Sequence, residues 1–413
     1  MKYIVVVISL VSAAISPAAA TTPKEIVVHY ADLAYAIYED ALMSARQLQH
    51  AVNQLIAKPT EENLKRARDA WKAARVPYQQ SEAYRFGNAI VDDWEGRVNA
   101  WPLDEGLIDY VSVSYGEHSD MNDFYAVNII ASKEITLAGK SIDVSEITAS
   151  LLTEVLHGID EVESNVATGY HAIEFLLWGQ DLNGTGPGAG ERPASDYDVQ
   201  QCRVGHCQRR AQYLRVVTAL LVDDLTWMVK QWGHDGQARG DLLQLSVDQA
   251  VAAMLKGIGS LSYGELAGER MKLGLLLHDP EEEHDCFSDN THAAHFNNAL
   301  GIKNVYTGSY RRINGQQLKG PSLSEWVAGK DTALNQHMLT LLDSTLNKMQ
   351  VLVHSAEQEG VAYDQLIAEG NQAGNAKVEA AIEALIQQTQ GIESVVKLLE
   401  LGQVVFEDSE SLH

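Results

Sequence analysis

The segment Ile26–Ala57, with the sequence IVVHYADLAYAIYEDALMSARQLQHAVNQLIA, decides the fold class. Apolar residues such as Leu33 and Ile37 recur in it at helical spacing. Pro59 ends the pattern, and Thr60 followed by two acids is typical of the start of another helix. The sequence therefore predicts two long consecutive helices near its beginning.

The same spacing continues through most of the chain. The second helix is expected to run towards Phe86, with Pro77 as a kink or a break. Further helical patterns cover residues 146–156, 170–178, 207–232, 247–257, 261–277, 333–358 and 378–399. Strand patterns are scarce, and the one short candidate is Val111–Ser114. The prediction is an all-α protein.

The first twenty residues have the pattern of a secretory signal peptide. Lys2 precedes the apolar run Ile4–Ile15, and small residues up to Ala20 follow it. The run is shorter than the roughly 20 apolar residues that cross a membrane. We therefore expect residues 1–20 to be a cleaved signal and the protein to be exported.

The net charge and the cysteines limit which partners and ligands the protein can have. The formal net charge of -25 repels phosphate backbones, so we expect no nucleic acid partner. In an oxidising compartment, Cys202 and Cys207 are expected to form a local disulfide. Zinc ligation by these two cysteines with His206 is the alternative. Cys286 is then expected to be a buried free thiol.

A predicted helix with two potential metal ligands begins at Gly169, in the sequence GYHAIE. His171 and Glu174 are three residues apart, so both side chains lie on one helix face and can meet one metal ion. The residues that follow are apolar, which places the pair in a buried segment. A structural His–Glu ion pair is the alternative, because a buried carboxylate needs a partner.

Several stretches resemble one known family. Residues 168–179, TGYHAIEFLLWG, resemble the Gly-x-His-x-x-Glu signature of the imelysin-like family. Three further matches to the motifs of that family are NAWPLD at 99–104, RRAQYL at 209–214, and ERM at 269–271 followed by EHDCFSDNTH at 283–292. The subgroup that the chain resembles most is the iron-regulated imelysin-like proteins of bacteria.

The resemblance implies an architecture and a setting. It implies two domains that each resemble a four-helix bundle, here residues 21–230 and 231–413, with the site near their junction. It also implies a periplasmic or outer-membrane-associated protein of iron acquisition, whose partners are a metal ion and cell-envelope iron-uptake components. Membrane association would then come only through partners. Iron is the expected ion, and zinc also suits a site of imidazole and carboxylate ligands.

The resemblance also implies a wider ligand set. Glu82 stands where iron-uptake relatives carry acids, and Asp104 lies in the first-half motif, so the expected metal ligands are His171, Glu174, Glu82 and Asp104. The expected supporting residues of the cleft are Gly169, Asp109, Arg270, Asp285, Ser288, Asp289 and His292. Asp104 could instead cap a helix, and Asp109 could be a solvated or capping acid. Arg270 is expected to pair with an acid of the second-half motif.

Two other functions fit parts of the sequence. A zinc peptidase of the insulin-cleaving type would use His171 and Glu174 with a distant third histidine, such as His284 or His292. The chain lacks His-Glu-x-x-His, and Phe175 removes its inverted form. A non-enzymatic module for haem or a peptide is the second alternative, because tryptophan and tyrosine residues lie near the motifs.

Overall fold

The computed structural model describes residues 22–413, so the predicted signal peptide lies outside the described residues. Helices dominate this part of the chain, which confirms the predicted all-α class. The α-helices are α1 (Pro23–Ala57), α2 (Glu61–Ser81), α3 (Ala89–Asn99), α4 (Glu105–Ile108), α5 (Gly169–Trp178), α6 (Cys207–Trp232), α7 (Gln237–Gln244), α8 (Val247–Ser260), α9 (Leu273–Leu277), α10 (Thr291–Thr307), α11 (Leu323–Lys330), α12 (Thr332–Glu357), α13 (Tyr363–Ile367) and α14 (Gln372–Leu398).

Shorter elements connect these helices. Two segments have the wider π-helical turn, η3 (Leu151–Leu156) and η6 (Leu261–Lys272). The 3₁₀ turns are η1 (Glu82–Tyr84), η2 (Val113–Tyr115), η4 (Ile159–Glu161), η5 (Ala194–Tyr197), η7 (Pro280–Glu282), η8 (Cys286–Ser288) and η9 (Glu410–Leu412).

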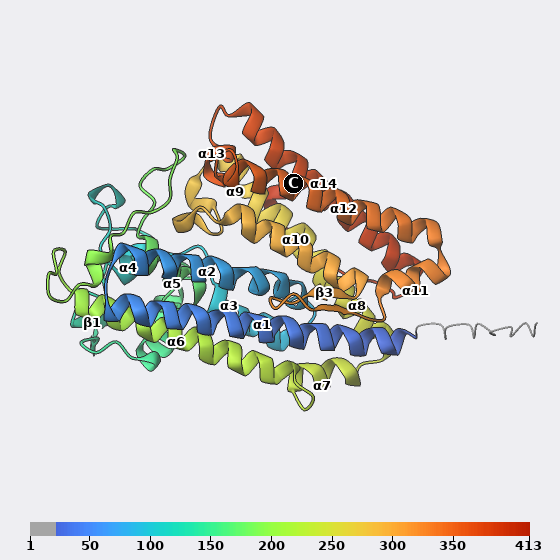
Figure 1. Ribbon diagram of the computed structural model, residues 1–413, viewed down its shortest axis with the longest axis horizontal. Helices are drawn as coiled ribbons and strands as arrows, with labels where there is room; N and C mark the ends of the chain where they lie inside the picture. The colour runs from blue at the N-terminus through green and yellow to red at the C-terminus, as the bar shows by residue number, and fades with distance from the viewer. Residues whose placement is uncertain (1–21) are drawn as a thin grey trace, which may run out of the picture.

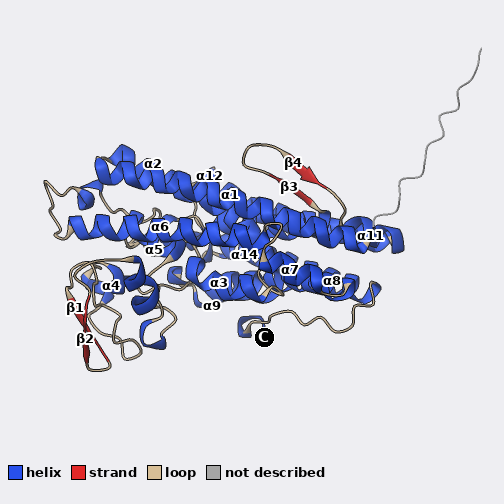
Figure 2. Cartoon of the chain, turned by 90° about the horizontal axis from the view of Figure 1, so that it is seen from below, coloured by secondary structure: helices blue, strands red, loops and turns tan. Residues whose placement is uncertain are grey.

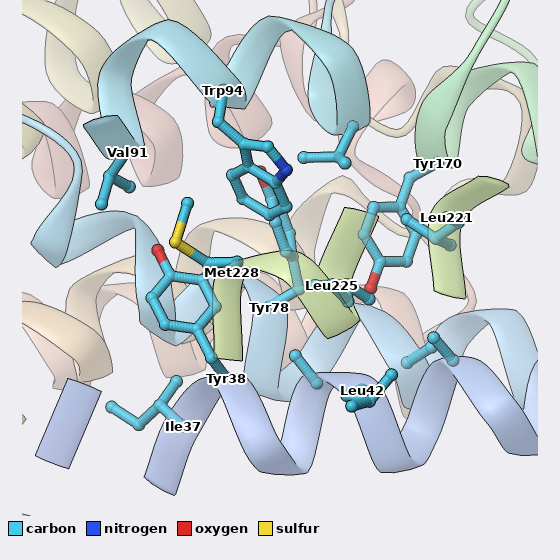
Figure 3. Close-up of a cluster of buried hydrophobic side chains, with 14 of the residues drawn as sticks. Ile37, Tyr38, Leu42, Tyr78, Val91, Trp94, Tyr170, Leu221, Leu225 and Met228 are labelled. Atoms are coloured by element: carbon cyan, nitrogen blue, oxygen red, sulfur yellow. The ribbon is translucent and has the colours of Figure 1, made fainter. Parts of the chain in front are cut away.

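One layer of the molecule contains α1, α2 and α6, which run side by side (Figure 1). Thr22 caps α1 through a reciprocal pair of hydrogen bonds with Glu25, which satisfies free backbone N–H groups at the helix start. The core of this layer packs Tyr38, Tyr78 and other aromatic rings against aliphatic side chains (Figure 3). Pro77 lies inside α2, which continues past it to Ser81.

A second layer contains α10, α12 and α14, and α10 packs against α2 of the first layer (Figure 1). The larger hydrophobic cluster draws on both layers, since Ile37 and Tyr306 both belong to it. A smaller cluster around Met271 and Tyr363 lies within the second layer. The apolar core therefore runs across residue 230, the boundary that the sequence predicted, and that boundary stays a prediction.

The π-helical segment η6 is covered by the last part of the chain. A Cβ atom on Gly264 would lie 2.6 Å from the carbonyl carbon of Glu407, and one on Gly268 would collide with the side chain of Ser409. The backbone N–H of Glu407 also donates to the hydroxyl of Ser260, 2.9 Å away. Small residues on η6 thus let the terminal segment lie directly on its backbone.

The strands form two antiparallel hairpins at the edge of the helical body (Figure 2). One pairs β1 (Glu134–Leu137) with β2 (Lys140–Asp143), and the other pairs β3 (Ser309–Arg311) with β4 (Gln317–Lys319). The predicted strand at Val111–Ser114 is wrong. The hydroxyl of Ser112 accepts a hydrogen bond from the backbone N–H of Ser114, and this local bond favours a turn over a sheet ladder.

Between residues 22 and 413, no helix combines the length and the apolar character needed to cross a membrane.

Candidate metal centre

The start of α5 is fixed against the end of α3. Gly169 has φ +82°, and a Cβ atom there would collide with the backbone of Val98. The hydroxyl of Thr168 donates to the carbonyl of Arg97 at 2.8 Å. Only glycine tolerates both the positive φ and this approach, so Gly169 sets the position of the whole motif helix.

His171 is held by a carboxylate through one ring nitrogen. Its Nδ1 lies 3.1 Å from Oε2 of Glu174. The other oxygen of Glu174 accepts from the backbone N–H of Ser288 at 3.0 Å and from the Ser288 hydroxyl at 2.6 Å. If Nδ1 carries the proton, as a carboxylate partner favours, Nε2 keeps a free lone pair. Nε2 is buried and has no hydrogen-bond partner.

Two further side chains face His171. The rings of His171 and His284 meet edge to face, with centroids 4.9 Å apart. One potential ligand atom each from His171, His284 and Asp285 lies within 4.8 Å of the other two. Two ligand atoms of one ion with bonds of about 2.0–2.2 Å lie at most about 4.4 Å apart, so these atoms would need to draw together only slightly to share an ion. The three side chains therefore form a buried donor group.

Arg75 completes the centre. It donates to both oxygens of Asp285, at 2.5 Å and 3.3 Å, and to Oδ1 of Asn99 at 2.6 Å. Arg75 is not among the residues that the sequence predicts for the site. The sequence does indicate that Arg75 is buried, because it lies four residues after Trp71 and three before Tyr78, on the apolar stripe of α2.

Burial and Arg75 set the charge states of the centre. Burial, reinforced by the positive charge of Arg75, lowers the pKa of His171 to about 3, so the imidazole is neutral. Burial and the charge of Asp285 raise the pKa of Glu174 well above its ordinary value, so the carboxylate form that accepts from Nδ1 of His171 requires a nearby cation that offsets this rise. Burial opposes ionisation of Asp285, but Arg75 outweighs it and lowers its pKa. Neutral imidazole beside an ionised carboxylate is the form in which both groups ligate metals.

Glu82 contacts other residues than those around His171. Its oxygens accept from Arg270 at 2.5 and 3.2 Å, from Asn99 at 2.7 Å and from Asn298 at 2.6 Å. Arg270 also donates to Glu265 at 2.5 Å. The expectation that Arg270 pairs with an acid of the second-half motif is therefore wrong. Its acidic partners lie on η1 and on η6 itself.

The structure also gives Asp104 and Asp109 other partners. Asp104 precedes α4 without capping it through its side chain, and it accepts from Asn122 and Ser164, each at 2.6 Å. Asp109 is buried and accepts two hydrogen bonds from Arg210, at 2.5 and 2.9 Å, and one from Arg192 at 2.7 Å. These contacts do not join either acid to the donor group around His171.

The remaining supporting residues lie where an open pocket meets the centre. Ser288, Asp289 and His292 line this pocket with Lys72. Lys72 donates to the carbonyl of Ser288 at 2.9 Å. Burial raises the pKa of Asp289 to about 6 and lowers that of His292 to about 4. Of the predicted supporting residues, Ser288 bonds to the motif directly, while Asp289 and His292 flank it.

The chain also contains one disulfide and a glycine-rich loop of residues 184–190. Cys202 and Cys207 are joined by a disulfide, and Cys286 is a free thiol that is only partly buried. The backbone N–H of Gly190, at the end of the glycine-rich loop, donates to the carbonyl of Phe287 at 2.9 Å. The loop thus lies beside the segment that carries His284 and Asp285.

Residues 34–392 match the family described as Imelysin. The chain belongs to the imelysin family. The match covers most of the chain and includes the motif helix, α2 and the segment with His284, so the centre described above lies wholly inside the family's extent. The sequence resemblance is therefore confirmed.

Two relatives of this imelysin-family chain carry iron in their names. An iron-regulated protein A of Synechococcus elongatus is 31% identical over 107 residues, which are 25% of this chain and 30% of that protein. The chain thus matches less than a third of that relative's length. The crystal structure of an iron-regulated protein A precursor from Parabacteroides distasonis has 19% identity and a TM-score of 0.63, over 92% of this chain and 97% of that one. The two chains share a fold.

Proposed function

We propose that this imelysin-family protein binds a metal ion, with iron as the expected one and zinc as the alternative, at the centre of His171, His284 and Asp285. Two observations carry the proposal: the buried Nε2 of His171 lacks a hydrogen-bond partner, and one ring nitrogen of His171 lies within 4.8 Å of ligand atoms of His284 and Asp285. A buried imidazole nitrogen without a partner is costly, and a metal ion would satisfy it.

In this proposal Glu174 positions His171 and does not itself ligate. Its Oε2 lies 3.1 Å from Nδ1 of His171, and Glu174 is not among the three residues whose ligand atoms all lie within 4.8 Å of one another. A carboxylate on the far nitrogen fixes the tautomer and the ring orientation of a ligating histidine. The contacts of Glu82 and Asp104 leave them outside the proposed ligand set.

The biological setting follows from the relatives' names and from the first twenty residues. Two relatives are named as iron-regulated proteins, and one of them is a precursor. We infer that this protein is exported to the periplasm or the outer membrane and serves iron acquisition. Its partners would be the ion and cell-envelope components that pass the ion on.

The test is a metal titration of the mature chain after chelation. Iron(II) without oxygen, iron(III), zinc and manganese are titrated into wild type, His171→Ala, His284→Ala and the control His354→Ala, whose side chain is 60% exposed. Loss of a ligand should weaken binding by more than about 100-fold, since loss of an outer partner alone costs 10- to 100-fold. His354→Ala should bind like wild type.

Two results would count against the proposal. One is wild-type affinity no better than that of His171→Ala. The other is metal-dependent peptide hydrolysis that disappears in both histidine variants, which would assign the same centre to a peptidase.

A further inference from the structure

A small pocket next to the metal centre is lined mostly by acids. Its walls are Asp181 after α5, the stretch around η7 and η8, and Asp364 at the start of α13. We call Asp181, Glu281, Glu283 and Asp364 the acidic pocket. It has room for about one water-sized sphere. No lining residue within the described part of the chain is Lys, Arg or His.

Two of these acids are buried and unpaired. Glu283 is 0% exposed and Asp364 is 2% exposed. In the described part of the chain, none of their four carboxylate oxygens meets a donor at full hydrogen-bond geometry. The side chain of Thr291 still lowers the pKa of Glu283, and the backbone N–H of Gln365 lowers that of Asp364. Glu281 and Asp181 lie at the rim, where they are more accessible. Ionised carboxylates are very costly to bury without a partner, so this pocket requires a proton or a cation.

Other buried acids of the chain show how unusual this is. Asp109, Glu82 and Asp285 are equally buried, and each accepts hydrogen bonds from at least one arginine. The pKa of Asp364 rises to about 7, first through burial and then through repulsion by Asp289 and Asp181. Burial also raises the pKa of Glu281 to about 8 and that of Glu283 well above its ordinary value, so protons and a cation compete for this pocket at neutral pH.

We infer that the acidic pocket binds one hard divalent cation of the calcium class, with Glu283 and Asp364 as its inner ligands and Glu281 and Asp181 at its rim. Its donors are carboxylate oxygens, which hard cations prefer over imidazole and thiol ligands. None of the four acids belongs to the His171–His284–Asp285 group, so this is a separate site from the proposed metal centre. Among the described residues no three of these acids have ligand atoms within 4.8 Å of one another, so only Glu283 and Asp364 are assigned as direct ligands.

The position of the pocket gives the bound ion a structural effect. Glu283 directly precedes His284 and Asp285, so an ion held by Glu283 would also hold the segment that carries two donors of the metal centre. It would at the same time tie this segment to α13 through Asp364 and to the end of α5 through Asp181.

The experiment is a calcium titration of the full mature chain by calorimetry, in buffer freed of transition metals. Wild type should bind one Ca²⁺ and melt at a higher temperature when it is present, since a ligand of the native state stabilises it. Glu283→Gln and Asp364→Asn should each lower the affinity by at least about tenfold, because ligand charge sets the affinity of oxygen sites. Both variants should also lose the Ca²⁺-dependent shift in melting temperature.

Two controls separate this site from its surroundings. Glu282→Gln changes the neighbouring acid of the same run, which does not line the pocket, and should leave Ca²⁺ affinity unchanged. His171→Ala should also bind Ca²⁺ normally, so this result is independent of the metal centre. Without Ca²⁺ the two pocket variants should melt no lower than wild type, because they remove repulsion. Absence of Ca²⁺ binding by wild type, or wild-type affinity in both pocket variants, would overturn the inference.

Discussion

Two buried polar centres lie side by side along α2 and differ in how completely they are paired. The Glu82 centre gives both carboxylate oxygens to Arg270, Asn99 and Asn298. The His171 centre is just as buried but leaves Nε2 of His171 without a partner. Asn99 joins the two, since it accepts from Arg75 and donates to Glu82. We call a centre saturated when all its polar atoms have hydrogen-bond partners. A saturated centre cannot bind a further ligand, whereas a centre with an unpartnered nitrogen can.

The strongest test of this contrast removes the arginine of the saturated centre. Arg270→Met leaves Glu82 buried without its cation and should lower the free energy of unfolding by about 3–5 kcal/mol. Urea unfolding measures the change. The control Arg239→Met breaks a pair with Asp32, whose side chain is 54% exposed, and should cost at most about 1 kcal/mol. Equal costs in the two variants would mean that the Glu82 centre is not a structural ion pair.

A second substitution alters only the positioning of His171. In Glu174→Gln the amide can donate to Nδ1, which would move the ring proton to Nε2 and remove the lone pair. Metal affinity should fall by about 10- to 100-fold, as for other outer carboxylates. Titration gives the affinity, and ¹⁵N chemical shifts of the ring report the tautomer. An unchanged affinity with an unchanged tautomer would show that Glu174 does not orient His171.

The pH dependence of stability distinguishes the centres in a third way. The pKa of His171 is about 3 in the folded chain and near 6.5 in the unfolded chain. Between these values the unfolded state binds one more proton, so this group stabilises the fold above pH 6.5 and its contribution is lost as the pH falls towards 3. His171→Asn should lower the slope of unfolding free energy against pH by up to about 1.4 kcal/mol per pH unit in that window.

Denaturant unfolding at several pH values between 3 and 6.5 measures this slope. His354→Asn, at an exposed position, serves as the control. A slope that stays at the wild-type value in His171→Asn would contradict a buried neutral imidazole at this position.

The smallest effect is expected for the residue that the sequence placed in the metal site. Glu82→Gln should change metal affinity by no more than about twofold, because Glu82 reaches the ligand Asp285 only indirectly, through Asn99 and Arg75. The same titration as for His171→Ala measures it. A loss as large as that of His171→Ala would return Glu82 to the ligand set.

Local patterns account for most of the fold that could be predicted. Helix α6 spans residues 207–232 as expected, because the apolar periodicity and the residues that begin and end the helix all lie within this segment. The hairpin β1–β2 was missed, since each strand has four residues and its alternation is too short to stand out. The helix expected at residues 146–156 forms from residue 149 onward, and Leu151–Leu156 within it have the wider π-helical turn, which apolar spacing does not reveal.

The site was predictable in its centre but not in its outer members. The motif fixed His171 and Glu174 because their spacing is local. Glu174 meets Ser288 over 114 positions of sequence, and Arg270 meets Glu82 over 188. Spacing along one helix cannot tell which of many acids a distant arginine will meet. Arg75 could have been identified from the sequence alone, because it is a charged residue on the apolar stripe of a helix.

The close contact between η6 and the terminal segment has a consequence for the order of synthesis. Arg270 lies on η6, and Gly264 and Gly268 on the same element are covered by Glu407 and Ser409. The bond from Glu407 to Ser260 spans 147 positions. While the chain is being made, η6 therefore emerges long before the residues that cover it. The Glu82–Arg270 pair therefore gains its final support only after Glu407 and Ser409 have been synthesised.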